Sequence, residues 1–356
     1  MSSPGAGFRR LRVAAVDRLT DDAVAVTFAV PDELAGALAF RPGQHLTLRR
    51  PDGPDVRRTY SVCSSAAGGP LRVAVKRLEG GTFSGWVVDA LRAGDELEVL
   101  PPAGRFGARP EPGRALRYGL VGAGSGITPL LSIAATVLDV EPGSEVVLLY
   151  GNRTSREVMF LDELADLKDR HPQRLQLLHL LSQEEQESAL LSGRIDRARL
   201  ERLFATLLPV DDVDEWYLCG PFEMVGTARQ ALLDAGADPA AVHAELFHAE
   251  AAPLRAPRPE GSTARLATVV AQLHGRSSTV RVDRDTGTVL DAVLAVRPDA
   301  PYACRGGVCG TCRARVSAGA VEMDVNYALE PDELEAGVVL TCQARPTTDE
   351  VRLEFL

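Results

Sequence analysis

Apolar residues recur with a different period in successive stretches of the chain. Over residues 8–112, partial alternation of apolar and polar positions marks strand-like segments at 10–16, 23–30 and 71–75, with Gly- and Pro-rich turns between them. A period of two is typical of half-buried strands, and many short strands joined by such turns form small barrels or sandwiches. We therefore predict a small antiparallel β-barrel or sandwich here.

The pattern changes between residues 113 and 250, where short apolar runs alternate with segments of helical period. The strand-like runs are 118–122, 146–150, 175–180, 216–219 and 241–247. The helical segments are 128–138, 159–170, 196–207 and 222–235. Alternating β and α units predict a parallel sheet covered by helices.

A Pro-rich segment, 251–264, separates these two stretches from the last one and is typical of a semi-extended linker. Residues 265–356 then open with a predicted hairpin over 267–273 and 278–282. A chain of 356 residues is long enough for two or three domains. The expected domains are 1–112, 113–250 and 265–356.

Charge and cysteine usage exclude several partners and compartments. The net charge of −10 argues against nucleic acid and anionic membrane surfaces. Residues 1–10 have no apolar segment behind their charges, and no apolar run approaches the length of a membrane span. Four of the six cysteines form a metal-type pattern, which favours a reducing compartment over a disulfide framework. We expect a cytoplasmic protein.

That pattern consists of Cys304, Cys309, Cys312 and Cys342, spaced C-x4-C-x2-C with the fourth cysteine downstream. The spacing is typical of a plant-type [2Fe–2S] cluster. Glycines between the first three let the backbone wrap a cluster, because glycine takes positive φ without steric cost. Zinc is the alternative, but zinc prefers paired C-x2-C units, and this set has only one.

Two motifs in the first stretch suit a flavin nucleotide. Arg58, Tyr60 and Ser61 offer a guanidinium for a diphosphate, a flat ring for an isoalloxazine and a small hydroxyl. The segment 80–84, GGTFS, precedes a helix-like stretch, where backbone N–H groups can approach a phosphate. Alone, the first motif also fits an ordinary exposed strand. Together, in a β-rich domain, the two motifs predict a flavin site.

A glycine-rich turn lies at the start of the second stretch. The segment 122–130, GAGSGITPL, follows a predicted strand and begins a helix, where a turn can present N–H groups to a pyrophosphate. Its spacing is G-x-G-x-G, which differs from the G-x-G-x-x-G dinucleotide fingerprint. A tight βα turn without a ligand is therefore the alternative.

Arginines follow the second predicted strand of this sheet. Arg153 and Arg156 lie in a loop that can reach an adenosine ribose, and arginine there favours a 2′-phosphate. The loop predicts NADPH, with NADH as the second candidate. A solvated arginine loop is the alternative interpretation.

Cys219, Gly220 and Pro221 lie where a predicted strand ends and a helix begins. Ligands of α/β sheets bind at the carboxyl ends of strands, so the Cys219 side chain is a candidate for contact with a nicotinamide. The alternative is a buried structural cysteine, because free cysteine is among the most buried residue types. We assign that structural role to Cys63.

In this order, the motifs resemble the ferredoxin–NADP+ reductase superfamily with a C-terminal plant-type ferredoxin, over essentially the whole chain. Within it the chain is similar to the reductase components of phenylacetyl-CoA epoxidases, in the segments 40–48, 150–155, 172–178, 192–196 and 329–334. The resemblance implies an antiparallel β-barrel that binds FAD, a parallel-sheet α/β nicotinamide domain and a β-grasp ferredoxin domain. FMN in place of FAD is the alternative, because some FMN reductases share the domain order.

The motifs and the resemblance together imply roles for individual residues. Residues expected at the flavin are Arg58, Tyr60, Ser61, Lys76, Gly81, Thr82, Ser84 and Phe247. Residues expected at the pyridine nucleotide are Gly122, Gly124, Gly126, Ile127, Thr128, Arg153, Arg156, Cys219, Gly220 and Pro221. Residues expected beside the reacting rings are Ser61, Thr128, Cys219 and Glu245.

A nicotinamide delivers two electrons as a hydride, whereas an oxygen-activating metal centre usually takes them singly, and a flavin can exchange electrons in both ways. The predicted route runs from NADPH through FAD and the [2Fe–2S] cluster to an oxygenase. The resemblance implies a multi-subunit phenylacetyl-CoA epoxidase as that partner. The alternatives are the reductase of a steroid or aromatic-ring hydroxylase, and a stand-alone redox carrier or sensor.

An acidic run precedes the fourth cysteine of the metal pattern. Its residues are Glu330, Asp332, Glu333 and Glu335. It is either a solvated helix start, where acidic side chains are favoured, or a surface that steers a basic partner.

Overall fold

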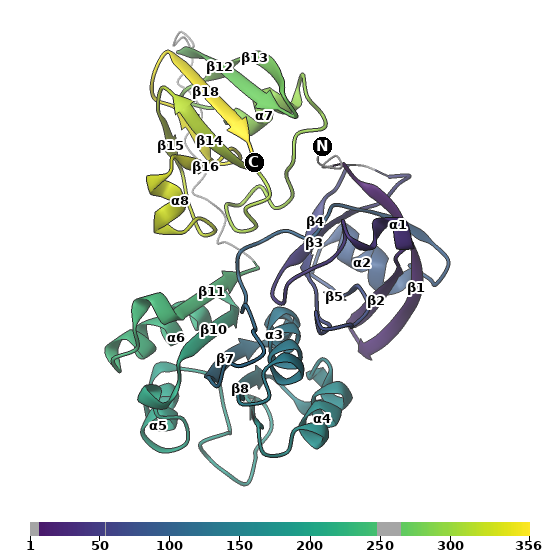
Figure 1. Cartoon of the computed structure of the whole chain (residues 1–356), viewed down its shortest axis with the longest axis vertical. Helices are drawn as coiled ribbons and strands as arrows, with labels where there is room; N and C mark the ends of the chain where they lie inside the picture. Colours follow the sequence, from purple (N-terminus) through teal and green to yellow (C-terminus); the bar gives the residue numbers. More distant parts are fainter. Residues whose placement is uncertain (1–6, 54, 248–264) are drawn as a thin grey trace. The chain divides into compact units, whose positions relative to one another are not determined.

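The computed structural model describes residues 7–53, 55–247 and 265–356 (Figure 1). The chain divides into one compact unit over Phe8–Phe247 and a second that contains the described residues after His248. The predicted linker, 251–264, lies outside the described residues. Because nothing in the fold fixes the other domain limits, the divisions at 112 and 250 stay predictions.

The first part of the unit Phe8–Phe247 is a closed antiparallel sheet. Its strands are β1 Arg9–Thr20, β2 Ala23–Ala29, β3 His45–Arg49, β4 Arg58–Ser61, β5 Arg72–Lys76 and β6 Glu96–Val99. Its helices are α1 Asp32–Ala35 and α2 Thr82–Asp89. The strand order is β4-β3-β6-β1-β2-β5, and a bridge between Val62 and Val73 joins the two ends. The predicted antiparallel barrel is confirmed.

Alternating side chains fill the barrel, as a period of two requires. Leu46 and Leu48 of β3 and Val26 of β2 are fully buried in one apolar cluster, which also receives Phe83 and Val87 from α2. The three strands that the sequence predicted at 10–16, 23–30 and 71–75 correspond to β1, β2 and β5.

The second part of this unit is a parallel sheet of order β11-β10-β7-β8-β9. Its strands are β7 Arg117–Ala123, β8 Glu145–Asn152, β9 Leu175–Leu181, β10 Glu215–Gly220 and β11 Val242–Leu246. Its helices are α3 Ile127–Val140, α4 Leu161–Arg170, α5 Arg197–Thr206 and α6 Phe222–Asp234. Its short 3-10 helices are η1 Gly124–Gly126, η2 Ser155–Glu157, η3 Val210–Asp212 and η4 Pro239–Ala241.

Helices cover both faces of this sheet, because its strands are apolar on both sides. On one face Leu120 and Leu148 pack with residues of α3 and α4. On the other face Val121 and Leu149 pack with residues of α5 and α6. The predicted parallel α/β domain is confirmed, and its carboxyl strand ends present their loops at one edge.

The second compact unit has a mixed sheet of order β13-β12-β18-β14-β16 and a small sheet of β15 with β17. Its strands are β12 Leu266–Leu273, β13 Arg276–Asp283, β14 Arg313–Ala318, β15 Val321–Met323, β16 Val338–Leu340, β17 Ala344–Pro346 and β18 Glu350–Phe355. Its helices are α7 Val289–Leu294 and α8 Pro331–Glu335.

The predicted hairpin corresponds to β12 and β13, which pair antiparallel, while β12 and β18 pair parallel. Val289 and Val293 of α7 pack into the core of the sheet. A mixed sheet that grips a helix in this way is the β-grasp that the resemblance implied.

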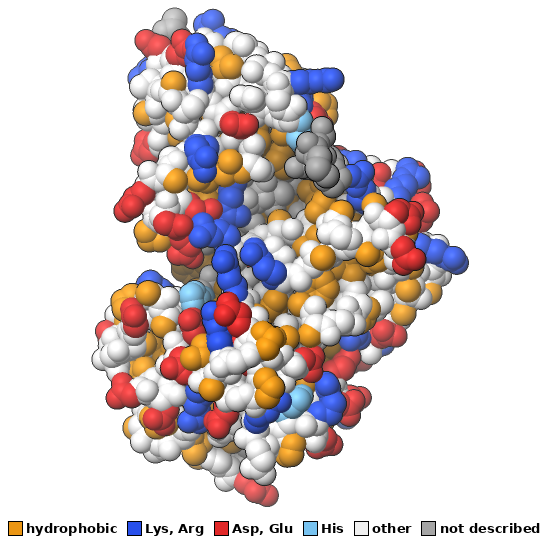
Figure 2. Space-filling model, viewed as in Figure 1, with side chains coloured by type: hydrophobic (Ala, Val, Ile, Leu, Met, Phe, Trp, Pro, Cys, Tyr) orange, Lys and Arg blue, Asp and Glu red, His pale blue; other side chains and the backbone are white. Residues whose placement is uncertain are grey.

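None of the helices in the described part of the chain is long and apolar enough to cross a membrane. Figure 2 shows acidic and basic side chains interspersed over much of the visible face. The net charge of −10 is therefore not gathered into a single visible patch.

Candidate active site and cluster loop

A largely buried carboxyl joins the flavin and nicotinamide parts of the unit Phe8–Phe247. Glu245 lies on β11, and its Oε2 accepts a hydrogen bond of 3.1 Å from the Ser61 hydroxyl at the end of β4. Cys219 is the partner of Glu245 in the β10–β11 register. Three of the four residues expected beside the reacting rings therefore lie together, although they are far apart in the sequence.

Burial sets the charge of these groups. Desolvation raises the pKa of Glu245 to about 8, although the hydrogen bond from Ser61 lowers it. Glu245 is therefore mostly protonated at neutral pH. Burial, together with the nearby Glu245 carboxylate, raises the pKa of Cys219 well above its usual range. Cys219 is thus a neutral thiol, as both the nicotinamide-contact and the structural interpretation require.

His45 is a further side chain at this carboxyl, and it was not predicted from the sequence. Its Nδ1 lies 3.9 Å from Oε1 of Glu245, and its ring is buried. His45 is the cross-strand partner of Ser61 in the β3–β4 hairpin, so both reach Glu245 from neighbouring positions. A Cβ at Gly104 would lie 3.0 Å from Nδ1 of His45, so glycine leaves room for the ring. The sequence signal that could have identified His45 is a polar residue at the start of an apolar strand.

The glycine-rich turn packs against the strand that contains Cys219. A Cβ at Gly126 would lie 2.2 Å from the Cys219 carbonyl oxygen, and one at Gly122 would lie 2.6 Å from Leu130 Cδ1. Gly124 has φ of +53°. Close packing therefore accounts for these glycines, as the tight-turn alternative holds. This packing also places the start of α3 beside Cys219. Contact of these glycines with a pyridine nucleotide stays a prediction.

The remaining residues predicted at the pyridine nucleotide lie in the glycine-rich turn and in the connection between β10 and α6. Ile127 and Thr128 begin α3 and are buried, and the Thr128 hydroxyl donates to the Ser125 carbonyl at 3.1 Å. Gly220 ends β10, and Pro221 is the N-terminal cap of α6. These residues lie at the carboxyl ends of neighbouring strands, where α/β sheets bind ligands.

On the flavin side, the ring of Tyr60 stacks on Phe83 of α2, with centroids 6.0 Å apart and an angle of 24° between planes. Gly81 is the N-terminal cap of α2 and Thr82 its first residue. The Ser84 hydroxyl accepts from the Leu78 N–H at 3.1 Å. It therefore stabilises its own loop. Contact of Gly81, Thr82 and Ser84 with a flavin diphosphate stays a prediction.

The other residues predicted at the flavin have side chains that bond to or pack against other parts of the unit. The Arg58 side chain is exposed and donates to the Arg57 carbonyl at 2.8 Å. Lys76 Nζ pairs with Asp22 at 3.3 Å. Phe247 is partly buried against the apolar core at the end of the unit. Contact of these side chains with FAD stays a prediction.

The arginine loop follows β8, as predicted. Arg153 pairs with Glu157 at 2.6 Å, and Arg156 is exposed. Ser155 lies between these two arginines in the sequence. Its backbone N–H and its hydroxyl both donate to the Glu184 carboxylate, at 3.0 and 3.1 Å. Glu184 was not singled out in the sequence, although it follows β9, whose carboxyl end lies at the same edge of the sheet.

In the second unit, the cysteine loop has the tight curvature that its glycines predicted. Gly307 and Gly310 have φ of +75° and +64°, and Arg305, which is not a glycine, has φ of +55°. The Arg305 guanidinium pairs with Asp291 at 2.9 Å, and the Gln343 side chain donates to the Arg305 carbonyl at 2.8 Å. These contacts hold the loop in a conformation that costs a non-glycine residue about 1 kcal/mol or more.

N–H groups point at the sulfurs of this loop. The donors are Gly306 to Cys304 at 3.4 Å, Thr311 to Cys309 at 3.5 Å and the Gln343 side chain to Cys342 at 3.4 Å. Hydrogen bonds to sulfur are one of the ways in which a protein tunes an iron–sulfur cluster. The loop is therefore suited to thiolates that carry negative charge.

The four sulfurs associate two by two. A hydrogen bond with Cys309 is the main cause that lowers the pKa of Cys304 to about 6. The hydrogen bond between Cys312 and Cys342 likewise lowers the pKa of Cys342. Within the described ranges no three His, Cys, Asp or Glu side chains gather closely enough to hold a single metal ion.

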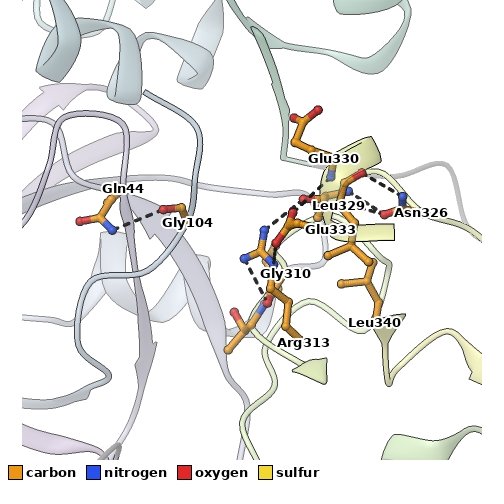
Figure 3. Close-up of polar contacts among 12 residues, drawn as sticks. Gln44, Gly104, Gly310, Arg313, Asn326, Leu329, Glu330, Glu333 and Leu340 are labelled. Carbon is orange, nitrogen blue, oxygen red and sulfur yellow. Dashed lines mark hydrogen bonds and ion pairs between the residues drawn. The ribbon is translucent and has the colours of Figure 1, made fainter. Parts of the chain in front are cut away.

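The acidic run has both buried and exposed side chains. Figure 3 shows Glu330 and Glu333 of this run beside Arg313. Glu333 is buried, pairs with Arg313 at 3.1 Å and forms a capping box with Glu330 at the start of α8. Glu330, Asp332 and Glu335 are exposed. The run therefore forms a helix start, as one interpretation predicted, but Glu333 is buried rather than solvated. Steering of a partner stays a prediction for Glu330, Asp332 and Glu335.

Comparison with protein families assigns a cofactor to each part of the chain. A model described as Oxidoreductase FAD-binding domain matches residues 10–107. One described as Oxidoreductase NAD-binding domain matches residues 120–230, and one described as 2Fe-2S iron-sulfur cluster binding domain matches residues 271–347. The cofactors are FAD, NAD(P)H and a [2Fe–2S] cluster.

Relatives align along the full length. The chain is 47% identical over 349 residues to a subunit of the 1,2-phenylacetyl-CoA epoxidase of Escherichia coli (strain K12), covering 98% of each chain. It is 39% identical to the 3-ketosteroid-9-alpha-monooxygenase, ferredoxin reductase component, of Rhodococcus rhodochrous, covering 97% of this chain and 96% of the relative.

A solved structure matches the fold of this chain along nearly its whole length. Phthalate dioxygenase reductase matches with a TM-score of 0.60 at 24% identity, covering 98% of each chain, and shows the fold alone. The full-length relatives confirm the predicted family. The chain therefore belongs to the NAD(P)H-dependent oxygenase reductases of the ferredoxin–NADP+ reductase superfamily, which carry FAD and a C-terminal [2Fe–2S] ferredoxin domain.

Proposed function

We propose that this chain supplies a multi-subunit phenylacetyl-CoA epoxidase with electrons from NADPH during phenylacetate catabolism. The observation that carries the proposal is the identity of 47% over 98% of both chains with one component of that epoxidase, against 39% with a steroid monooxygenase component. Because thiolates that bind a cluster must stay reduced, we also propose a cytoplasmic location.

The residues of the chain suit this task. When bound, FAD takes a hydride from the nicotinamide and passes electrons on singly. Ser61 and Glu245 would hold a proton-bearing group beside the flavin, since the carboxyl of Glu245 is mostly protonated at neutral pH. Cys219 and the start of α3 would confine the nicotinamide, and the four cluster cysteines would hold the electron outlet.

Reconstitution with purified oxygenase subunits tests the choice of partner. NADPH, this reductase and the other phenylacetyl-CoA epoxidase components are expected to consume phenylacetyl-CoA. A parallel mixture with a 3-ketosteroid-9-alpha-monooxygenase oxygenase is expected to turn over at least about tenfold more slowly, because a specific interface discriminates by more than about 1.4 kcal/mol. Faster turnover of the steroid mixture would replace the proposed partner with the alternative one.

A further inference from the structure

The contact between Glu184 and Ser155 is built into the backbone. The N–H of Ser182 donates to the Asn152 carbonyl at 3.0 Å, and that of Gln183 donates to the Arg153 carbonyl at 2.8 Å. These bonds continue the parallel pairing of β8 with β9 beyond the ends of both strands. Glu184 is therefore delivered to the turn that follows β8, where one carboxylate oxygen accepts both Ser155 donors, at 3.0 and 3.1 Å.

The chemistry of this turn is that of a site for an anionic oxygen. An N–H and a hydroxyl that converge on one oxygen, with arginines on either side, suit a phosphate as well as a carboxylate. Arg153 is already paired with Glu157 at 2.6 Å. Arg156 forms no hydrogen bond or ion pair with any residue that the structure describes. The turn therefore offers one available cation, while its two convergent donors are taken.

We propose that Glu184 is a specificity-determining residue, whose carboxylate competes with the 2′-phosphate of NADPH for Ser155 and so lowers the selectivity of the enzyme for NADPH over NADH. The inference rests on the use of pyridine nucleotides but not on the identity of the oxygenase. A phosphate that binds this turn must displace Glu184 and then lie beside its charge. A free ribose 2′-hydroxyl can instead donate to that carboxylate, as a ribose hydroxyl does to the acidic residue of a dinucleotide-binding fold.

Two substitutions separate the effect of the Glu184 charge from the effect of an oxygen that occupies the two Ser155 donors. Glu184→Gln keeps an oxygen that can accept from Ser155 but removes the negative charge. Glu184→Ala removes both. Glu185→Gln is the matched control, because it removes the same charge from the next residue, which is exposed and forms no hydrogen bond with the described part of the chain.

The experiment is steady-state reduction of ferricyanide by NADPH and by NADH, with FAD-loaded full-length protein. The ratio of kcat/KM for NADPH to kcat/KM for NADH is expected to rise about tenfold in Glu184→Ala, which corresponds to about 1.4 kcal/mol. The rise should come from a lower KM for NADPH. Glu184→Gln should show a smaller rise, and Glu185→Gln should leave the ratio within about twofold of the parent.

Competitive inhibition gives a readout without catalysis. Adenosine 2′,5′-bisphosphate should inhibit Glu184→Ala about tenfold more strongly than the parent, while 5′-ADP, whose free 2′-hydroxyl loses its acceptor, should inhibit Glu184→Ala no more strongly than the parent. An unchanged nucleotide ratio, or equal changes for both nucleotides and both inhibitors, would overturn the role of Glu184. Failure of the parent protein to oxidise either nucleotide would instead contradict the reductase function.

Discussion

The cluster loop and the Ser61–Glu245 junction are built in opposite ways. In the cluster loop, three of the four cysteines lie within nine residues of sequence, and N–H groups of neighbouring residues point at their sulfurs. At the junction, Ser61, Cys219 and Glu245 come from three strands of two sheets, and burial rather than local spacing sets the charge of the carboxyl.

The difference shows that one site is specified by residues close together in the sequence and the other by tertiary packing. A site whose ligands lie close together in the sequence, such as the cluster loop, depends on those few ligands, so a change in any one of them is poorly tolerated. A site made by the meeting of two folded parts depends on packing, so a mutation there is expected to alter rates and pH dependence before it abolishes function. Substitutions at each of the two sites can therefore break or sharpen this contrast.

Cys342→Ser is expected to break the cluster side of the comparison. Changing residues that only support a metal ligand typically costs 10- to 100-fold, so loss of a ligand should slow one-electron transfer to cytochrome c by roughly 100-fold or more. Ferricyanide reduction by NADPH should change by less than about twofold, because the flavin can serve that acceptor directly. Cys63→Ser, which alters a buried cysteine outside the pattern, should keep its iron. A Cys342 variant with full iron content would contradict the ligand assignment.

Much of the cluster site was predictable, because C-x4-C-x2-C is a local signal and its glycines take the positive φ that wrapping requires. The strands and helices of the α/β part also followed from periodicity, and their ends differ from the predicted ones by a few residues at most. The roles of His45 and Glu184 could not be read, because each depends on a partner that only strand pairing brings near: Ser61 across a hairpin for His45, and Ser155 across parallel strands for Glu184.

Ser61→Ala tests the junction. It removes the hydrogen bond to Glu245, and a bond of about 1.5 kcal/mol corresponds to a loss of roughly tenfold in the rate of flavin reduction by NADPH. Stopped-flow absorbance of the flavin measures that rate. Ser65→Ala, which removes a hydroxyl that bonds Asp139 at 2.7 Å elsewhere between the two parts, is the control. Equal losses in both variants would assign the effect to general loosening of the domain contact.

Glu245→Gln tests whether burial raises the pKa of the Glu245 carboxyl in the folded protein. The folded pKa of about 8 lies above the ordinary value of 4.5, so the folded state holds a proton that the unfolded state releases. This contribution to stability is fully present below pH 4.5 and is lost as pH rises through about 8, by roughly 1.4 kcal/mol per pH unit within that window. Urea unfolding of the first unit at several pH values should show a shallower slope for Glu245→Gln. Parallel curves would mean that Glu245 is ionised in the folded protein.

Neutralising the exposed part of the acidic run should have the smallest effect. The variant Glu330→Gln, Asp332→Asn and Glu335→Gln leaves the buried pair of Glu333 with Arg313 intact. Electron delivery to the oxygenase should fall by about two- to threefold at low salt, and the difference should vanish at high salt, because exposed charges are screened. A salt-independent rate equal to that of the parent would remove the steering role.

Electrons are expected to pass from the pyridine nucleotide through the flavin to the cluster. The decisive experiment is anaerobic mixing of the purified, FAD- and iron-loaded protein with NADPH, followed by its visible spectrum. The flavin absorbance is expected to bleach first, and the cluster absorbance should follow in the same reaction without any added carrier. Complete bleaching of the flavin while the cluster stays oxidised would contradict the account.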